Sequence, residues 1–268
     1  MDQTTRWEAE EAEQQKIWDT PTDMLKLEER RLWQEYVRLR SITSGRSETE
    51  LERISRKRTW NEWDLVRTEL AVREDSDRHA LSAAQAARDR SNLGERFGDR
   101  TFETFIASRA KDAFDICKAY SESDAAIRNG DGILLYGKQG VGKTHLAAAI
   151  ANALVDRGIF VLFDTYSNHL NKLKQEFNSK EERKYLKRLM RVPMLVIDDL
   201  GKEKQTDWTQ QVMFDIINYR YEHKLPVVIT TNLSMTNLEH YLDAAVFSRL
   251  CEMCRSICII GSDFRRQI

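Results

Sequence analysis

The chain has 268 residues, with 42 Lys and Arg against 43 Asp and Glu, and this balance argues against a protein that coats a polyanion through its overall charge. Hydrophobic residues make up 41% of the chain, so disorder throughout is excluded. The four Cys do not make a disulfide scaffold, and no apolar run approaches the roughly 20 residues of a membrane span. The charged opening predicts no secretory signal, and we expect a cytoplasmic protein without a membrane partner.

The first 95 residues are predicted to be helical. Only three of the eleven Gly and one of the three Pro fall in the first hundred residues, where Glu, Arg, Ala and Leu are abundant. Apolar residues recur at helical spacing over 25–39, a polar break follows at 41–47, and a second run covers 49–73 before a charged, Ala-rich stretch at 74–90. Residues 1–95 therefore predict an all-α N-terminal region.

Tryptophan is concentrated in this region. Five of the six Trp in the chain are Trp7, Trp18, Trp33, Trp60 and Trp63. Two interpretations stay open: the rings fill the core of a small helical bundle, or they belong to an arm that docks a partner, since Trp is enriched at interfaces.

The composition changes at 91–98, which predicts a linker, and from 99 to 268 short apolar strands alternate with helices. This alternation predicts a parallel sheet covered by helices on both faces, with ligands bound at the carboxyl ends of the strands. The expected strands are 133–136, 159–163, 194–197, 227–230 and 256–260. The expected helices are 108–121, 143–156, 168–177, 180–191 and 207–223, with one or two short helices in 235–250.

The strongest motif is the segment Gly137-Lys138-Gln139-Gly140-Val141-Gly142-Lys143-Thr144, which fits the phosphate-loop pattern G-x-x-x-x-G-K-[ST]. It lies between a predicted strand and a predicted helix, as a phosphate loop requires. Glycines let backbone N–H groups approach phosphate oxygens, and the helix N-terminus adds positive potential. Lys143 is expected to reach the β- and γ-phosphates, and Thr144 to offer its hydroxyl to Mg²⁺. We include His145 in the nucleotide-binding segment, with packing as its expected role.

A pair of acids follows the apolar strand at 194–197. Asp198 and Asp199 would lie at the carboxyl edge of the sheet, beside the phosphate loop. Asp198 is expected to help hold Mg²⁺, and Asp199 to orient the attacking water.

Three further polar residues are candidates for the reaction. Asn232 follows the strand at 227–230 and is expected to position water or to sense the γ-phosphate. Arg249 is expected to act as an arginine finger on the nucleotide of a neighbouring subunit. Arg265, near the end of the sequence, is expected to contact the γ-phosphate in cis.

In this order, the motifs resemble the DnaC/IstB-like branch of the AAA+ ATPases, from about residue 100 to 266. The resemblance is carried by the segments 99–105, 134–152, 197–201, 211–221 and 229–232. It implies an α/β AAA+ P-loop NTPase domain, with a central parallel sheet flanked by helices, that binds ATP and Mg²⁺ and forms an ATP-dependent homo-oligomer.

Within this branch, DnaC-like proteins load the replicative hexameric helicase onto single-stranded DNA, and IstB-like proteins help a transposase to choose its target. The helical, Trp-bearing region at 1–95 favours the helicase loader. Two alternatives stay open: a helper ATPase for a transposase, and a nucleotide-switched adaptor with negligible turnover.

The chain departs from some relatives in two ways. No Cys precedes Cys117, so the Cys-rich zinc module of certain loaders is not expected. Asp199 stands where the wider AAA+ class has Glu, and its shorter side chain leads us to expect slow, DNA-stimulated hydrolysis.

Basic residues are frequent in 168–191. Lys172 and Lys174, together with Phe177, are the candidate contacts to single-stranded DNA, because cations bind phosphate and aromatic rings stack on bases. The resemblance implies that this segment faces the pore of the assembly. The alternative is a solvated helical hairpin whose aromatic residues pack inward.

Overall fold

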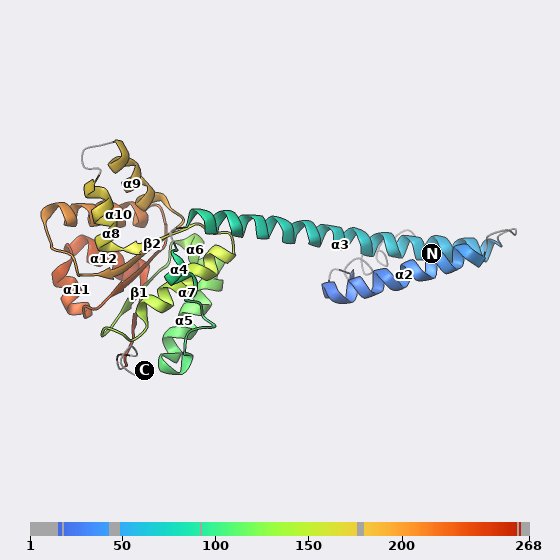
Figure 1. Ribbon diagram of the computed structural model, residues 1–268, viewed down its shortest axis with the longest axis horizontal. Coiled ribbons are helices and arrows are strands. Elements are labelled where there is room, and N and C mark those ends of the chain that lie inside the picture. Colours follow the sequence, from blue (N-terminus) through green and yellow to red (C-terminus); the bar gives the residue numbers. More distant parts are fainter. Residues whose placement is uncertain are drawn as a thin grey trace. The chain divides into compact units, whose positions relative to one another are not determined.

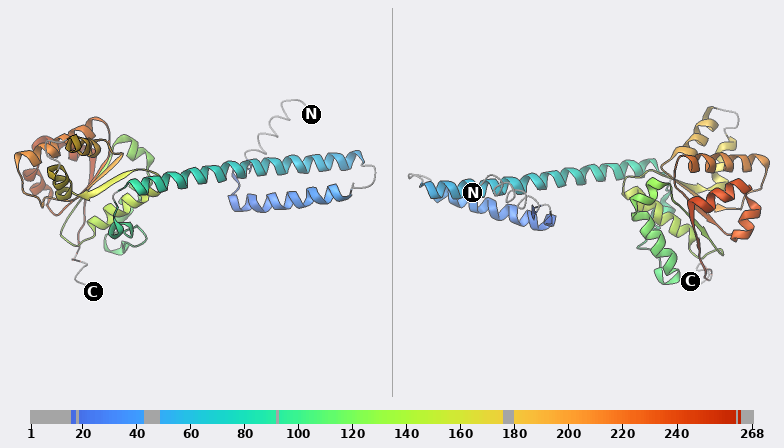
Figure 2. Two further views of the ribbon diagram at one scale, coloured as in Figure 1. Left: turned by 45° about the horizontal axis from the view of Figure 1, so that its top comes forward. Right: turned by 180° about the vertical axis from the view of Figure 1, so that it is seen from behind.

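The computed structural model describes residues 16–17, 19–42, 49–91, 93–175, 180–261 and 263. The chain forms two compact units, which we call the N-terminal unit (1–80) and the C-terminal unit (81–268). Figure 1 labels their elements, and Figure 2 shows them from two further directions. Among the described residues, none of the helices combines the length and the apolar character needed to cross a membrane.

The described part of the N-terminal unit is built on helix α2 (Thr22–Ile42) and on the first part of helix α3 (Glu50–Arg90). Its small core consists of the buried residues Leu25, Leu32, Val66 and Leu70. The two helices are antiparallel: the ring of Trp33 lies 5.1 Å from that of Trp63, and the ring of Tyr36 lies 5.0 Å from that of Trp60. Leu and Val at helical spacing thus supply the apolar seam between the helices.

Of the Trp residues in this region, the structure describes Trp33, Trp60 and Trp63. Trp63 packs against the small core, whereas Trp33 and Trp60 are 44% and 39% exposed. Trp7 and Trp18 lie outside the described residues. The exposed rings leave the docking interpretation open, because Trp at a surface is available to a partner.

Helix α3 is one continuous helix, although the composition suggested two separate stretches at 49–73 and 74–90. It is continuous because neither Gly nor Pro interrupts residues 50–90. Composition placed the domain boundary near residue 95, and the division of the structure lies between Ala80 and Leu81. The last turns of α3 belong to the C-terminal unit because Ala87 is part of its core and Arg88 pairs with Asp156.

The described part of the C-terminal unit contains a five-stranded parallel sheet in the order β2-β3-β4-β1-β5. Its strands are β1 (Gly132–Tyr136), β2 (Val161–Thr165), β3 (Met194–Leu200), β4 (Val227–Thr231) and β5 (Cys254–Cys258). The expected parallel sheet is thereby confirmed.

Helices cover both faces of this sheet (Figure 1). One core cluster packs α5 (Lys111–Glu122) and α7 (Lys143–Asp156) on the sheet, together with Ala87 of α3. The cluster on the other face involves α8 (Tyr166–Gln175), α9 (Lys180–Arg191), α10 (Asp207–Glu222), α11 (Met235–Tyr241) and α12 (Ala244–Met253). The smaller elements are α4 (Glu95–Gly98), a 3-10 turn (Ala107–Arg109) and α6 (Asp124–Asn129).

Two strands lie two residues away from their predicted positions: β2 spans 161–165 instead of 159–163, and β5 spans 254–258 instead of 256–260. The N–H group of Ile159 donates to the carbonyl of Leu154 at 2.9 Å, so Ile159 completes the end of α7. Ile260 is 83% exposed, so its apolar character does not extend β5 into the core. The helix at 143–156 lies where the sequence predicted it.

Candidate nucleotide-binding site

The predicted phosphate loop connects β1 to α7. Gly142 is the residue before α7 and has a left-handed backbone, with φ of 99°. A Cβ atom at this position would approach Phe105 to 2.8 Å, so both the conformation and the space require glycine. The helix is held firmly, since Leu146, Ile150 and Leu154 are fully buried. The N-terminal N–H groups of α7 therefore point toward a fixed anion site.

The ammonium group of Lys143 is held inside this loop, and the residue is only 5% exposed. Its Nζ donates to the carbonyl oxygens of Gly137 at 2.9 Å and Lys138 at 2.7 Å. It also donates to Asn232 Oδ1 at 2.8 Å. The phosphate loop and the end of β4 thus meet at one cation.

Asp198 lies at the carboxyl end of the sheet and is 2% exposed. The hydroxyls of Thr144 and Thr230 both donate to its Oδ1, at 2.9 Å and 2.5 Å. Burial raises the pKa of this carboxyl above its usual range, while the two hydroxyl hydrogen bonds oppose that change. A buried carboxylate with hydroxyl donors fits a divalent cation with oxygen ligands, so Thr144 and Asp198 are suited to hold Mg²⁺.

Asp199 has a left-handed backbone, with φ of 56°, which is uncommon for a residue with a side chain. Its N–H donates to Thr230 Oγ1 at 2.9 Å, at a point where the β3–β4 register shifts. Its Oδ2 accepts a hydrogen bond from Lys202 Nζ at 2.7 Å. The local backbone strain therefore turns two consecutive acids, Asp198 and Asp199, toward the same cavity.

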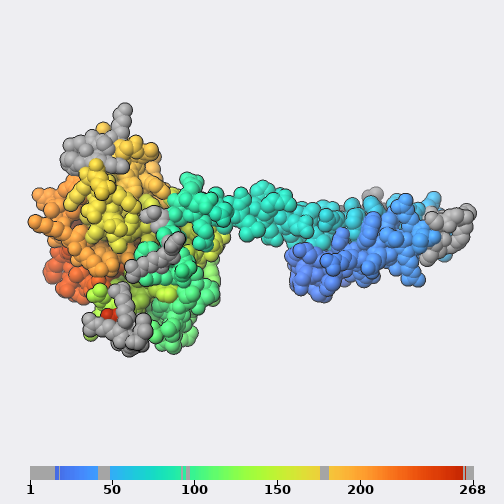
Figure 3. Space-filling view, in the orientation of Figure 1, coloured from blue at the N-terminus to red at the C-terminus, as the bar shows by residue number. Residues whose placement is uncertain are grey.

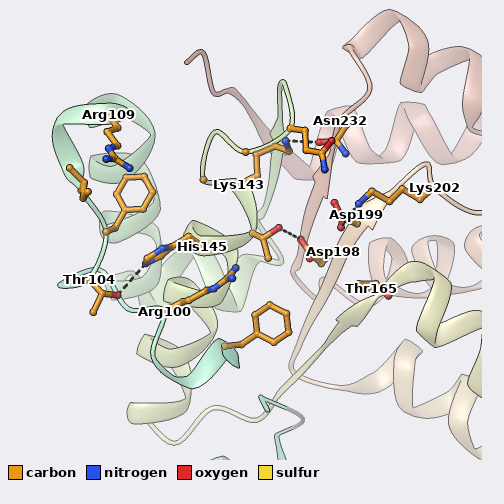
Figure 4. Close-up of a pocket in the computed structure, with 17 residues that line it drawn as sticks. Arg100, Thr104, Arg109, Lys143, His145, Thr165, Asp198, Asp199, Lys202 and Asn232 are labelled. Atoms are coloured by element: carbon orange, nitrogen blue, oxygen red, sulfur yellow. Dashed lines mark hydrogen bonds and ion pairs between the residues drawn. The ribbon is translucent and has the colours of Figure 1, made fainter. Parts of the chain in front are cut away.

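That cavity has a volume of about 560 Å³, within the usual range of small-molecule sites. Its phosphate-loop side consists of Gln139, Gly140, Gly142, Lys143, Thr144 and His145, and the acids, Thr165, Lys202 and Asn232 close another side. The lead-in segment supplies the wall formed by Phe97, Arg100, Thr104, Phe105, Ile106 and Arg109. Figure 4 shows the cationic, hydroxyl and acidic groups gathered around this space.

His145 joins the lead-in segment to α7. Its Nε2 lies 3.0 Å from the carbonyl oxygen of Thr101 and 3.2 Å from Thr104 Oγ1, and its ring meets Phe105 edge-on at 5.2 Å. Burial lowers the pKa of this imidazole, which favours the neutral ring. His145 therefore combines packing with a place in the cavity wall.

The structure gathers most of the predicted nucleotide-site residues. Three of them do not line the cavity: Gly137, Lys138 and Val141. The carbonyl groups of Gly137 and Lys138 accept hydrogen bonds from Lys143, and Val141 is fully buried in the core. Arg249 on α12 is outside the cavity of its own chain, with its guanidinium 5.4 Å from the ring of Phe214 and 5.7 Å from that of Tyr221. Arg265 lies outside the described residues.

The candidate DNA contacts in α8 have partners within the fold. Lys172 Nζ pairs with Asp164 Oδ2 at 2.8 Å, and Lys174 Nζ lies 5.2 Å from the ring of Trp208. Phe177 lies outside the described residues. Tyr185 of α9 packs against the core on this side of the sheet. This inward packing is what we expected of an aromatic residue if 168–191 forms a solvated helical hairpin.

Sequence reasoning missed Thr230, Lys202 and the arginines of the lead-in wall as members of the site. Thr230 stands inside an apolar strand run, where a hydroxyl carries no signal of its role. Lys202 follows Gly201, whose left-handed φ of 98° turns the chain back beside the acids. The segment Asp-Asp-Leu-Gly that precedes Lys202 was the feature of the sequence that could have placed this lysine in the site.

Residues 40–268 match the family described as IstB-like ATP binding protein. The chain belongs to the IstB-like ATP-binding family. Among relatives of this IstB-like chain, the Bacillus subtilis replicative helicase loader DnaI is 31% identical over 128 residues, which cover 47% of this chain and 40% of DnaI. The Escherichia coli replicative helicase loader DnaC is 34% identical over 116 residues, which cover 42% of this chain and 47% of DnaC.

Among solved structures, a crystal structure of the DnaC helicase loader matches this IstB-like chain with a TM-score of 0.58 and 29% identity. The match covers 62% of this chain and 100% of that one. The matches span 30–60% of the length of these curated relatives. Together with the sheet order, these likenesses identify the C-terminal unit as a DnaC-like AAA+ domain.

Proposed function

We propose that this IstB-like protein loads a replicative hexameric helicase onto single-stranded DNA, and that ATP binding and slow hydrolysis gate its assembly and release. The observation that carries the proposal is the convergence of Lys143, Asn232, Thr144 and Asp198 at one cavity, in a domain similar to DnaI and DnaC. A loader acts where the chromosome is replicated, so the proposal assigns the protein to the cytoplasm.

Each residue then has a task in ATP hydrolysis. The phosphate-loop amides and Lys143 would bind the phosphates. Thr144 and Asp198 would hold Mg²⁺, which would supply positive charge to the phosphates. Asp199 accepts a hydrogen bond from the attacking water, and Asn232 holds that water in line with the γ-phosphate.

Arg249 acts in this proposal on the nucleotide of the next subunit. Arg249 does not line the cavity of its own chain, and its half-buried side chain lies against two rings of α10, which agrees with a residue that serves the site of another subunit. ATP would therefore favour a homo-oligomer, and each site would be complete only when a neighbour supplies this arginine.

The exposed Trp33 and Trp60 of the N-terminal unit are proposed to contact the helicase. Rigid aromatic rings that are partly exposed in the free protein gain the most by burial in a partner. The N-terminal unit (1–80) would then serve as the partner-binding region and the C-terminal unit (81–268) as the ATPase region.

Two alternatives have support of their own. The family match over 40–268 is to IstB-like proteins and agrees with a helper ATPase for a transposase. The ion pair of Asp199 with Lys202 agrees with an adaptor that binds ATP with negligible turnover, since the acid already has a partner.

Capture assays separate these functions. The full-length protein, immobilised with ATP, is offered the replicative helicase or a transposase from the same host. Retention of the helicase supports the loader, and retention of the transposase alone would replace it with the helper. Release of phosphate over many turnovers excludes the adaptor.

A further inference from the structure

Two aromatic residues of α10 hold the guanidinium of Arg249. Phe214 and Tyr221 are seven residues apart on this helix, so their rings lie on one side of it, about 10.5 Å apart along its axis. The guanidinium carbon of Arg249 lies 5.4 Å from the centroid of Phe214 and 5.7 Å from that of Tyr221, close to half of that separation in each case. Figure 3 shows the orange segment that contains α10 at the surface of the C-terminal unit. Arg249 is thus held between two rings at this surface.

The charge of this guanidinium is not neutralised within the described part of the chain. The flat face of a guanidinium contacts aromatic rings, and the N–H groups at its edge remain available to a bidentate acceptor. Among the described residues, no carboxylate pairs with Arg249. The rings therefore fix the position of the arginine and leave its donors for an anion.

Glu252 is the carboxylate that could neutralise Arg249, and it has a different partner. The two residues are three positions apart on α12, a spacing at which opposite charges pair on a helix. Glu28 and Arg31 on α2 have the same spacing and do form an ion pair. Glu252 Oε2 instead accepts a hydrogen bond from the hydroxyl of Tyr221 at 2.9 Å.

The hydroxyl of Tyr221 is a lasting donor in this contact. Its hydrogen bond to Glu252 is the main cause that raises the pKa of Tyr221, so the hydroxyl stays protonated at neutral pH. Tyr221 therefore bounds the guanidinium of Arg249 with its ring and occupies the nearby carboxylate with its hydroxyl.

The packing of α12 on α10 does not depend on this polar contact. Val246 and Leu250 of α12 are buried in the same core as Ile216 and Ile217 of α10. Glu252 is exposed, so its hydrogen bond competes with water and adds little to stability. The contact between Tyr221 and Glu252 therefore acts mainly on its neighbour, Arg249.

We infer that Tyr221 is a positioning residue for Arg249: it holds Glu252 away, so that Arg249 stays unpaired and can contact the phosphates bound to a second copy of this chain. Without the hydroxyl, Glu252 would turn to Arg249 and neutralise it. This role of Tyr221 rests on the proposed action of Arg249 in trans, and it explains what keeps the arginine available.

The substitution Tyr221→Phe keeps the ring and removes the hydroxyl. In the full-length protein with ATP, Mg²⁺ and single-stranded DNA, turnover should fall about three-fold, an effect within the range of partly exposed ion pairs. Addition of Glu252→Gln should restore turnover, because an amide does not neutralise Arg249. Tyr219→Phe removes a hydroxyl from the same helix and should leave turnover unchanged.

Mixed subunits show which copy of the chain Tyr221 serves. A Lys143→Ala subunit supplies Arg249 and an Arg249→Ala subunit binds ATP, so turnover by the mixture reports the arginine acting between copies. Tyr221→Phe should lower this turnover when the Lys143→Ala subunit carries it. The same substitution on the Arg249→Ala subunit should not, because that subunit has no arginine to position.

Three results would overturn the role of Tyr221: wild-type turnover in Tyr221→Phe, no recovery when Glu252→Gln is added, or an equal loss whichever subunit carries the substitution. If the mixture of Lys143→Ala and Arg249→Ala is itself inactive, Arg249 does not act in trans, and the role of Tyr221 is refuted with it. Helicase capture by Tyr221→Phe is measured separately, so a failure of the loader function is distinguished from a failure of this contact.

Discussion

The ammonium group of Lys143 lies 2.8 Å from the amide oxygen of Asn232, although 89 residues separate them in sequence. The contact exists because β1 and β4 are neighbours in the sheet and both end at the same edge. The cation that would bind the γ-phosphate therefore touches the amide that would position the water. The proposed function therefore links nucleotide binding and hydrolysis at this one contact.

This relationship predicts the effect of Asn232→Ala. The loss of the amide should lower ATP turnover by about 10²-fold, the loss expected when a reacting group is misplaced by about 1 Å. ATP affinity should change only a few-fold, because Lys143 keeps two carbonyl partners. Phosphate release and calorimetric ATP binding measure the two quantities. The exposed Asn237→Ala serves as the matched control, and wild-type turnover in Asn232→Ala would remove its catalytic assignment.

Asp199 and Lys202 give a second prediction. Asp199→Asn should keep ATP binding and lose turnover by about 10²-fold or more, since an amide accepts no proton from water. Asn also tolerates the left-handed backbone at this position, so the fold should be kept.

Lys202→Met should instead raise turnover a few-fold, because the ammonium no longer occupies Asp199 Oδ2. Lys204→Met changes the same charge at an exposed neighbour and should have no effect. Equal turnover in Lys202→Met and the wild-type protein would show that the ion pair does not restrain Asp199.

Arg249 is tested by mixing subunits. Arg249→Ala should bind ATP normally and hydrolyse it poorly, because the neighbouring site lacks its arginine. Lys143→Ala should bind no ATP but still present Arg249. A mixture of the two variants should recover part of the turnover that neither shows separately. If the mixture stays inactive, or if Arg249→Ala turns over ATP like the wild type, Arg249 does not act in trans.

His169 predicts a pH dependence of stability. It is 1% exposed, its Nδ1 lies 2.8 Å from Tyr185 Oη, and burial lowers its pKa to about 4. The nearby Asp164 raises that pKa and Lys172 lowers it, by smaller amounts. The folded protein therefore keeps the ring neutral between pH 4 and about 6.5, where the unfolded chain takes up a proton.

Stability is thus fully present above about pH 6.5 and falls as the pH drops, by up to about 1.4 kcal/mol per pH unit for this one group. His169→Gln keeps a hydrogen-bonding side chain but does not titrate, so its free energy of unfolding should fall less between pH 7 and pH 5. Urea denaturation at the two pH values measures the difference. The same fall in both proteins would show that His169 does not set it.

The sequence predicted the parts of the site that depend on local chemistry. The phosphate loop and helix 143–156 follow from glycines, a Lys-Thr pair and an apolar helix face, and the structure has the helix at those residues. Lys172 and Lys174 lie in the same basic stretch of sequence as the exposed cations of α9. Their partners, Asp164 and Trp208, are distant in sequence and are set by the fold, so their pairing could not be predicted. The membership of Thr230 in the site depends likewise on the register of β3 and β4.

Unwinding on covalently closed circular single-stranded DNA measures ATP-gated helicase loading directly. The replicative helicase is supplied with ATP and a labelled annealed oligonucleotide, alone, with the wild-type protein, or with Lys143→Ala. We predict that only the wild-type protein raises unwinding well above the level of the helicase alone. No increase with the wild-type protein, or the same increase with Lys143→Ala, would contradict ATP-gated loading.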